Sequence, residues 1–153
     1  MFRDADPAAV ARSAEALRLD AVQLHGHERE REIAALRSRL PKATEVWALC
    51  GVDIHAELPR KAADRTLFDS RRQGRSGGMG LRFDWSLLRD REDLPSGFLA
   101  GGIGPANAAA AARVGAFGLD VGSGVEAGPG RKDPAKVADL FAALRVPGRG
   151  DAQ

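Results

Sequence analysis

The sequence contains a single cysteine, Cys50, among its 153 residues. One cysteine cannot form an intramolecular disulfide bond, so nothing in the sequence indicates passage through an oxidising compartment. The sequence also lacks an apolar run approaching the ~20 residues that are needed to cross a bilayer, and its first residues (MFRDADP) do not form an apolar signal segment. We therefore expect a cytoplasmic protein that is neither exported nor embedded in a membrane.

A dominant sign of charge is absent as well. The sequence has 23 Lys and Arg residues against 21 Asp and Glu residues, and its formal net charge is +2. Because the basic residues are scattered among acidic ones, no nucleic acid or other polyanion is indicated as a partner. With 44% hydrophobic and 29% charged residues, the composition is typical of one globular domain with one core. We place this domain at residues 1–146 and expect the Gly- and charge-rich residues 147–153 to be disordered.

Short apolar runs rich in β-forming residues recur along the chain. They predict five buried strands, at Ala21–Leu24, Glu45–Cys50, Thr66–Phe68, Phe98–Ala100 and Phe117–Val121. Amphipathic or alanine-rich segments separate them. These segments predict helices at Glu28–Leu40 and Pro105–Val114, and at two further places where an acidic cap precedes a proline, Asp6-Pro7 (a helix running to about Leu17) and Asp133-Pro134. A helix between every pair of strands is typical of an α/β fold with a parallel sheet.

One connection breaks this regularity. The segment Asp69–Phe83 (DSRRQGRSGGMGLRF) contains four glycines and shows no helical periodicity. Loops of this length in a compact domain are usually functional. We therefore expect this segment to close over a ligand site.

Glycine and polar residues follow the predicted strands, at the ends that face the ligand in parallel α/β folds. The last two strands are followed by Gly101–Gly104 and Gly122–Gly124. Glycine lets backbone N–H groups approach an anion closely, and barrels commonly bind phosphate after their last two strands. We interpret the two loops as a phosphate site, although glycines in tight turns between strand and helix are an alternative.

Asp69 and His25 follow two other predicted strands. A carboxyl group shielded from water beneath a loop can act as a general acid near neutral pH, and Asp69 is placed for that role. Taken alone, Asp69 could equally be a turn residue, and a single strand-end histidine such as His25 is more often structural. His27 and His55 lie beside Glu28 and Glu57 in expected surface positions, and no function is indicated for them.

Four separated motifs occur in the order found in phosphoribosylanthranilate isomerases. They are LDAVQLHG at 19–26, LFD at 67–69 followed by GGMG at 77–80 and FDW at 83–85, LAGGI at 99–103 with Pro105 and Asn107, and LDVGSGVE at 119–126 with Pro129-Gly130 and Lys132-Asp133. The chain therefore resembles this family over residues 20–133, and its first helix also fits.

The resemblance implies an Amadori rearrangement of N-(5-phosphoribosyl)anthranilate, without metal or organic cofactor, in tryptophan biosynthesis. It implies that Asp69 is the general acid that protonates the furanose ring oxygen. It places Asp120 at the sugar hydroxyls and His25 in the pocket near the anthranilate ring. The implied phosphate-binding residues are Gly101, Gly102, Gly122, Ser123 and Gly124.

Two motifs of the family do not occur in the sequence: the Lys-Ile-Cys-Gly-like first strand with the general-base cysteine, and the substrate-binding arginine after the second strand. Alignment by motif makes Met1-Phe2 the end of the third strand. We therefore expect an incomplete (β/α)8 TIM barrel, from the end of strand 3 through helix 8, because a whole barrel needs at least ~200 residues. Cys50 falls on the fifth strand of that alignment and is interpreted as a core residue.

Other interpretations stay open. One is a different phosphosugar-binding barrel, such as an epimerase or a histidine-pathway isomerase, although the motifs at 19–26 and 69–85 argue against it. Another is a non-catalytic remnant that binds a phosphosugar, or a fragment completed by a second chain. An unclosed barrel would expose strand edges, so self-association through them is expected.

Overall fold

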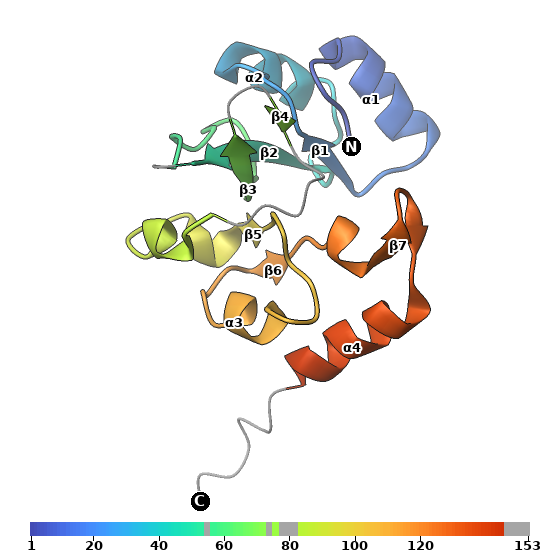
Figure 1. Ribbon diagram of the computed structural model, residues 1–153. Helices are drawn as coiled ribbons and strands as arrows, with labels where there is room; N and C mark the ends of the chain where they lie inside the picture. Colours follow the sequence, from blue (N-terminus) through green and yellow to red (C-terminus); the bar gives the residue numbers. More distant parts are fainter. Residues whose placement is uncertain (54–55, 73–74, 77–82, 146–153) are drawn as a thin grey trace, which may run out of the picture.

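The computed structural model describes residues 1–53, 56–72, 75–76 and 83–145. Its centre is a sheet of five parallel strands in the order β1-β2-β3-β5-β6 (Figure 1). These strands are β1 (Ala21–Leu24), β2 (Glu45–Val52), β3 (Arg65–Arg72), β5 (Phe98–Leu99) and β6 (Gly118–Leu119). Spatial order follows chain order, so each connection returns the chain to the neighbouring position, as in successive βα units. The expected parallel α/β sheet is confirmed.

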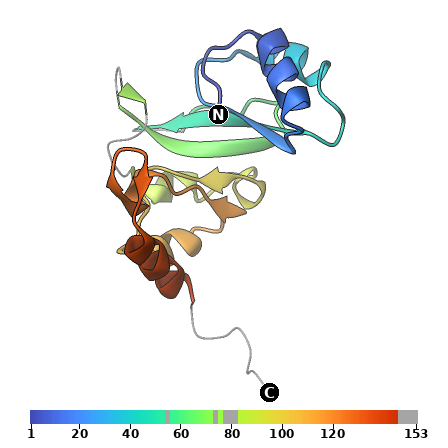
Figure 2. The ribbon, with the colours of Figure 1, turned by 90° about the vertical axis from the view of Figure 1, so that its right-hand side faces the viewer.

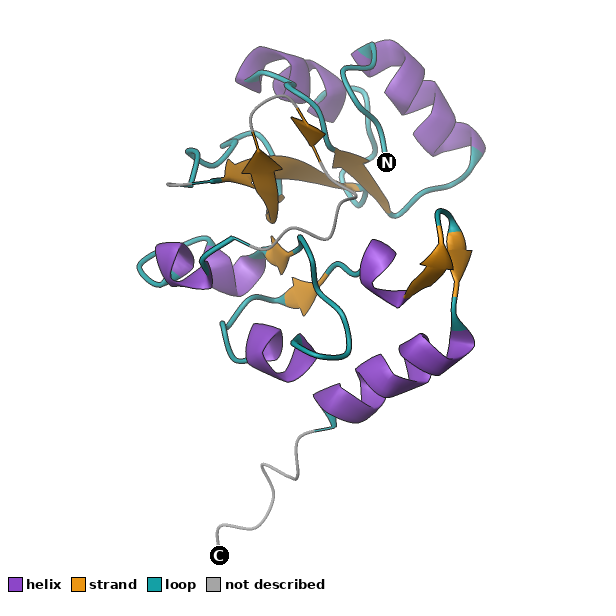
Figure 3. Cartoon of the chain, viewed as in Figure 1, coloured by secondary structure: helices purple, strands orange, loops and turns teal. Residues whose placement is uncertain are grey.

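Helices lie outside this sheet (Figure 3). In the described residues they are α1 (Pro7–Ala16), α2 (Glu30–Arg37), α3 (Ala108–Ala112) and α4 (Pro134–Leu144), with 3-10 helices at Trp85–Leu88, Leu94–Ser96 and Ser123–Val125. The predicted caps form: the Asp6 carboxylate accepts from Ala9 N, and Asp133 accepts from Ala135 N. Each cap satisfies a backbone donor that has no partner within its helix.

Apolar residues on the outer face of the sheet pack in separate clusters. Val22, Leu24, Val46 and Ala48 alternate with inward-facing residues and pack against α1 and α2. From α2, the side chains of Ile33 and Leu36 are 0% and 1% exposed, and burial of one such side chain contributes about 1.5–3 kcal/mol. In the described residues the buried apolar side chains form three clusters rather than the single core that was expected. A helix layer wrapped around a curved sheet contacts successive strands separately, which explains the division.

The sheet is curved, so that its two ends approach each other. β1 and β6 stand at opposite ends of the strand order. Even so, the Gln23 amide on β1 donates to Asp120 Oδ2 directly after β6, at 3.1 Å. Figure 2 shows the upper half of the molecule, with β1, β2 and β3, facing the lower half with β5 and β6. The concave face is therefore enclosed on two sides.

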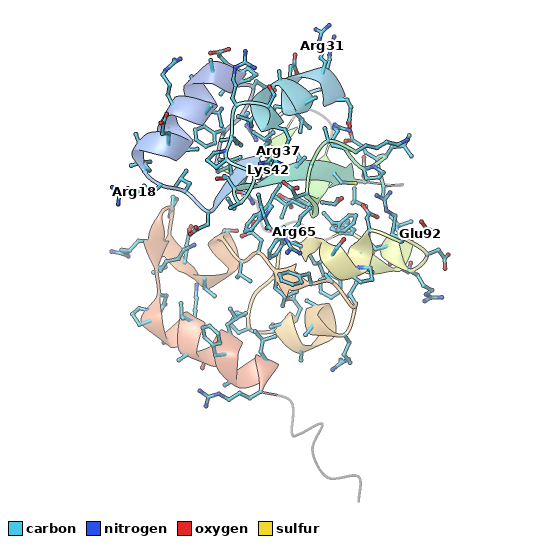
Figure 4. All side chains as sticks on the ribbon, turned by 180° about the vertical axis from the view of Figure 1, so that it is seen from behind. Arg18, Arg31, Arg37, Lys42, Arg65 and Glu92 are labelled. Carbon is cyan, nitrogen blue, oxygen red and sulfur yellow. The ribbon has the colours of Figure 1, made fainter. Side chains whose placement is uncertain are left out.

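A polar and aromatic cluster fills the concave face at the amino ends of the strands. The Arg65 guanidinium donates to both Glu45 oxygens, at 2.9 and 3.0 Å, and lies 4.1 Å from the ring centroid of Phe117. The Trp47 indole donates to Glu45 at 2.7 Å. Hydrogen bonds from Arg65 and Trp47 lower the pKa of Glu45. In Figure 4 Arg65 lies in the middle of the molecule, whereas Arg18, Arg31 and Glu92 project from its periphery.

Two connections differ from the prediction. No helix lies between β2 and β3 in the described residues, where Val52 instead forms a bridge with Ala56 and residues 61–64 form a turn. The connection is short and contains Pro59, which removes a backbone donor. Between β3 and β5, the described residues form two 3-10 helices and no α-helix. The prediction of a helix between every pair of strands was therefore wrong.

The boundaries of other elements also moved. β3 continues four residues beyond the predicted end and pairs with β4 (Arg75–Ser76), so the long connection begins as strand. Helix α3 begins at Ala108 rather than Pro105, because residues 105–107 form a turn. A hairpin of β7 (Glu126–Gly128) and β8 (Arg131–Lys132) was not predicted. Residues 77–80 and 147–153 lie outside the described residues.

The first residues run beside β1. Phe2 forms a parallel bridge with Leu24, and its backbone exchanges hydrogen bonds with Gln23 and His25 at 2.8 Å. This is the arrangement expected for the end of a strand next to β1. None of the described helices is both long and apolar enough to span a bilayer.

Candidate active site

A buried polar pair lies at the carboxyl ends of the strands. His25 follows β1 directly, and Asp69 lies within β3 rather than after it. The two residues are 8% and 6% exposed, and His25 Nε2 is 3.3 Å from Asp69 Oδ2. Since buried polar groups are costly without partners, these side chains depend on each other and on the backbone around them.

The second oxygen of Asp69 is held by the following residue. Oδ1 accepts from the backbone N–H of Ser70 at 2.7 Å, and the Ser70 hydroxyl is 3.4 Å away. Gly101 lies against the same oxygen, since a Cβ at Gly101 would come within 2.7 Å of it. Gly101 also has a φ of +84°, in the left-handed region that favours glycine. Glycine is therefore required here for both space and conformation.

The two glycine loops contact each other through their backbones. A Cβ at Gly124 would lie 1.9 Å from the Ile103 carbonyl oxygen, and a Cβ at Gly104 would lie 3.1 Å from the Gly124 carbonyl oxygen. Gly102 has a φ of +63°. The loops after β5 and β6, which the sequence predicts as one site, therefore lie side by side.

Side chains hold both loops from outside. The Asn107 amide accepts from Gly104 N at 2.8 Å and donates to the Gly102 carbonyl at 2.9 Å. The Lys132 ammonium donates to the Gly122 carbonyl at 2.8 Å and to Glu126 at 2.9 Å. These contacts fix the direction of the loop backbones, which is what an anion site built from N–H groups requires.

The loop after β1 is clamped to the first residues of the chain. The buried Glu28 carboxylate accepts from Gly26 N at 2.9 Å and from Asp4 N at 2.8 Å. Asp4 in turn accepts from His27 N at 2.6 Å, and this bond is the main cause that lowers the pKa of Asp4. His27 is exposed, as expected. Glu28 therefore fixes the backbone that carries His25.

The site residues that the sequence predicts, where the structure describes them, lie at the same end of the sheet. His25, Asp69 and Gly101 are in contact, and the loops at 101–104 and 122–124 adjoin them. Asp120 belongs to the same end of the sheet, because its backbone N–H donates to the Leu99 carbonyl at 2.9 Å. His55 and the glycines at 77, 78 and 80 lie outside the described residues. Ser70, Gln23 and Glu28 were missed, because only their contacts in space distinguish them.

Cys50 is not part of this site. It is 1% exposed on the outer face of β2, and its thiol donates to the Glu57 carbonyl at 3.2 Å. Burial raises the pKa of Cys50 to about 11, against a smaller opposing effect of Arg91. A thiol that stays protonated at neutral pH is a poor nucleophile and a poor base.

We expect Cys50 in the folded chain to resist alkylation by iodoacetamide at pH 8 and to react in urea as an ordinary exposed thiol. Mass spectrometry of the labelled protein measures both rates. Equal rates with and without urea would contradict the burial and the raised pKa.

Comparison with solved structures identifies the fold class of the sheet and its helices. The chain superposes on a crystal structure of phosphoribosyl anthranilate isomerase from Thermus thermophilus with a TM-score of 0.74 and 31% identity, over 94% of this chain and 69% of that one. A phosphoribosyl anthranilate isomerase in complex with reduced 1-(o-carboxyphenylamino)-1-deoxyribulose 5-phosphate gives a TM-score of 0.66 and 30% identity, over 92% and 66% of the two chains. The curved sheet with its outer helices is thus that of the (β/α)8-barrel proteins.

Sequence comparison identifies the family within this class. The model of the N-(5'-phosphoribosyl)anthranilate (PRA) isomerase family matches residues 1–143. An N-(5'-phosphoribosyl)anthranilate isomerase of Rhodopseudomonas palustris is 42% identical over 151 residues. The "Tryptophan biosynthesis protein TrpCF" of Yersinia pestis is 46% identical over 147 residues. The chain belongs to the PRA isomerase family. It spans 30% of the length of the Yersinia protein and 69% of the length of the Rhodopseudomonas protein.

Proposed function

We propose that the protein carrying this chain isomerises N-(5-phosphoribosyl)anthranilate to 1-(2-carboxyphenylamino)-1-deoxyribulose 5-phosphate in tryptophan biosynthesis. The observation that carries the proposal is the buried Asp69 carboxyl group, in contact with the glycine loop after β5 at the carboxyl end of the sheet. Membership of the PRA isomerase family supports the same reaction.

In this reaction Asp69 is the general acid. It delivers a proton to the furanose ring oxygen, the bond between that oxygen and C1 breaks, and the anthranilate nitrogen forms a Schiff base with C1. Loss of the C2 proton to a base then gives an enol, which becomes the ketose when a proton is added at C1 and the enol hydroxyl at C2 loses its proton. The hydrogen bond from Ser70 N holds the Asp69 carboxyl group in position while it gives up its proton.

The substrate phosphate binds where the loops at 101–104 and 122–124 meet. Gly101, Gly102, Gly122, Ser123 and Gly124 supply backbone N–H groups, because side chains that could crowd an anion are absent or small there. Asp120 accepts hydrogen bonds from the sugar hydroxyls in place of the bond that it now receives from Gln23. His25 lines the pocket near the anthranilate ring.

The base that removes the C2 proton comes from outside these 153 residues in this proposal. Cys50 is buried on the outer face of the sheet with a raised pKa, and the Lys-Ile-Cys-Gly-like motif does not occur in the sequence. The reaction needs proton transfers alone, so no cofactor is included. We also propose that the protein works in the cytoplasm, on a small phosphosugar and without nucleic acid or membrane as a partner.

Isomerase activity of the complete encoded protein tests this proposal. We expect conversion of N-(5-phosphoribosyl)anthranilate to the ketose, measured by chromatography, and no conversion by the 153-residue polypeptide alone. Reduced 1-(o-carboxyphenylamino)-1-deoxyribulose 5-phosphate serves as the reduced product analogue in a binding assay. Tight binding of this analogue by the complete protein, without any turnover, would favour the non-catalytic phosphosugar-binding alternative. If the complete protein neither binds the analogue nor converts the substrate, the proposed function is contradicted.

We further propose that the 153-residue polypeptide associates with itself through the edge of β6. The sheet order ends at β6, and a cavity of about 520 Å³ lies beside it, between α3 and α4. Leu119 and Val121 line this cavity from the sheet, and Phe141 of α4 is 57% exposed at it. An unpaired strand edge beside an apolar surface favours association.

Sedimentation of this polypeptide over a range of concentrations measures the association. We expect concentration-dependent dimers or larger species, and a weaker association in the variant Phe141→Glu. Leu17→Glu is the matched control, because Leu17 is 69% exposed at the end of α1, away from β6. A monomer at every concentration, or equal effects of the two substitutions, would contradict the proposal.

A further inference from the structure

We propose that His25 is a positioning residue for Asp69: its ring Nε2–H donates to Asp69 Oδ2 and fixes the direction in which the acid delivers its proton. The inference rests on the proposed function, since it assigns a partner to the general acid of that reaction. It goes beyond the resemblance, which places His25 only in the pocket near the anthranilate ring.

The contact joins two strands that are not neighbours. β2 lies between β1 and β3, and its residue in register with Asp69 is Gly51, which has no side chain. The His25 ring therefore reaches Asp69 over a glycine, and the distance from Nε2 to Oδ2 is 3.3 Å. Catalytic hydrogen bonds are often long before substrate binds and shorten in the complex.

The other ring nitrogen decides where the proton sits. His25 Nδ1 is buried and has no hydrogen-bond partner among the described residues. A proton on Nδ1 would therefore be a buried donor without an acceptor, which costs about 1–3 kcal/mol. With its proton on Nε2, the ring leaves Nδ1 as an unpaired acceptor but directs its N–H donor at the Asp69 carboxyl group, so one of the two ring nitrogens has a partner.

Two anchors determine the plane of the Asp69 carboxyl group. Ser70 N holds Oδ1 at 2.7 Å, and one bond alone leaves the group free to rotate about its own axis. A second donor at Oδ2 removes that freedom. Correct orientation of a proton donor is worth a large part of its catalytic effect, and a misplacement of ~1 Å can cost ~10²-fold in rate.

The backbone of His25 does not depend on this side-chain contact. Its N–H donates to the Phe2 carbonyl at 2.8 Å, its carbonyl accepts from Arg3 Nε at 3.2 Å, and Glu28 holds the next residue. The ring can therefore be replaced while the loop keeps its course. A loss of activity after replacement of the ring then reports on the contact with Asp69 and not on the structure of the loop.

The test compares three variants of the complete encoded protein, all assayed as isomerases. His25→Gln keeps an N–H donor near the Nε2 position, and His25→Phe and His25→Leu remove it. We expect kcat to fall ~10–10²-fold in the Phe and Leu variants, with KM within about twofold, and to be largely retained in the Gln variant. Leu is included beside Phe because the larger ring could pack poorly, and thermal unfolding of each variant is measured in parallel.

A double variant shows whether His25 acts through Asp69. We expect His25→Phe to cost little further activity when added to Asp69→Asn, because residues that act as a unit are not additive. Additive losses, a change confined to KM, or full activity of the Phe and Leu variants would overturn the positioning role while leaving the isomerase function intact. An inactive unsubstituted protein would overturn the proposed function and this role together.

Discussion

Substitution of Asp69 by Asn is expected to lower the kcat of the complete encoded protein by ~10²–10⁴-fold and to leave substrate binding nearly unchanged. The amide keeps the size of the carboxyl group but cannot deliver a proton to the ring oxygen. Asp69 is 6% exposed, Oδ1 accepts from Ser70 N and Oδ2 lies 3.3 Å from His25 Nε2, so the substitution changes a buried group with fixed contacts. Steady-state kinetics and calorimetry with the reduced product analogue measure the two effects separately.

Asp20→Asn is the matched control for this experiment. Asp20 is exposed and precedes β1, at the end of the strand opposite to His25, so the same chemical change is made away from the site. We expect normal turnover from the control. Near-normal turnover by the Asp69 variant would show that another residue is the acid.

The second large effect is expected from Gly124→Val, which should abolish binding of phosphosugars in calorimetry. A Cβ at this position would lie 1.9 Å from the Ile103 carbonyl oxygen, far closer than any van der Waals contact. The two glycine loops must therefore separate, and the N–H groups that we assign to the phosphate no longer point to one place.

Gly128→Val provides the control for Gly124→Val. Gly128 lies in β7, and a Cβ there would meet nothing within 4 Å. We expect the control to bind the reduced product analogue with unchanged affinity. Retained affinity in the Gly124 variant, with unfolding temperatures alike, would contradict the phosphate assignment.

The sequence predicts the strands well because their signal is local. Each of the five apolar runs is a strand of the sheet, and β1 has the predicted bounds. The acid-proline starts of α1 and α4 also have the predicted first residues, since capping depends on neighbours in sequence. Helix α2 is shorter than its periodicity indicates and covers Glu30–Arg37, because helix ends depend on local hydrogen bonds as well as on apolar spacing.

The connections and the partners of the site residues were not predictable in the same way. The extension of β3 to Arg72 depends on its pairing with β2 and β4, which apolar spacing does not encode. The motifs marked Asp69 and the glycine loops as a site, but the hydrogen bond from Ser70 and the contact with His25 arise from folding in three dimensions. Roles in catalysis and phosphate binding stay predictions for the experiments above.

The hydrogen bond between Gln23 and Asp120 joins residues that are 97 positions apart. Most other contacts of the sheet lie within successive βα units, whose short loops close cheaply and early in folding. The bond between the two ends can form only after every unit between them has taken its place and the sheet has acquired its full curvature. Helix content therefore reports on the folding of separate units, whereas the hydrogen bond between Gln23 and Asp120 reports on folding of the sheet from β1 to β6.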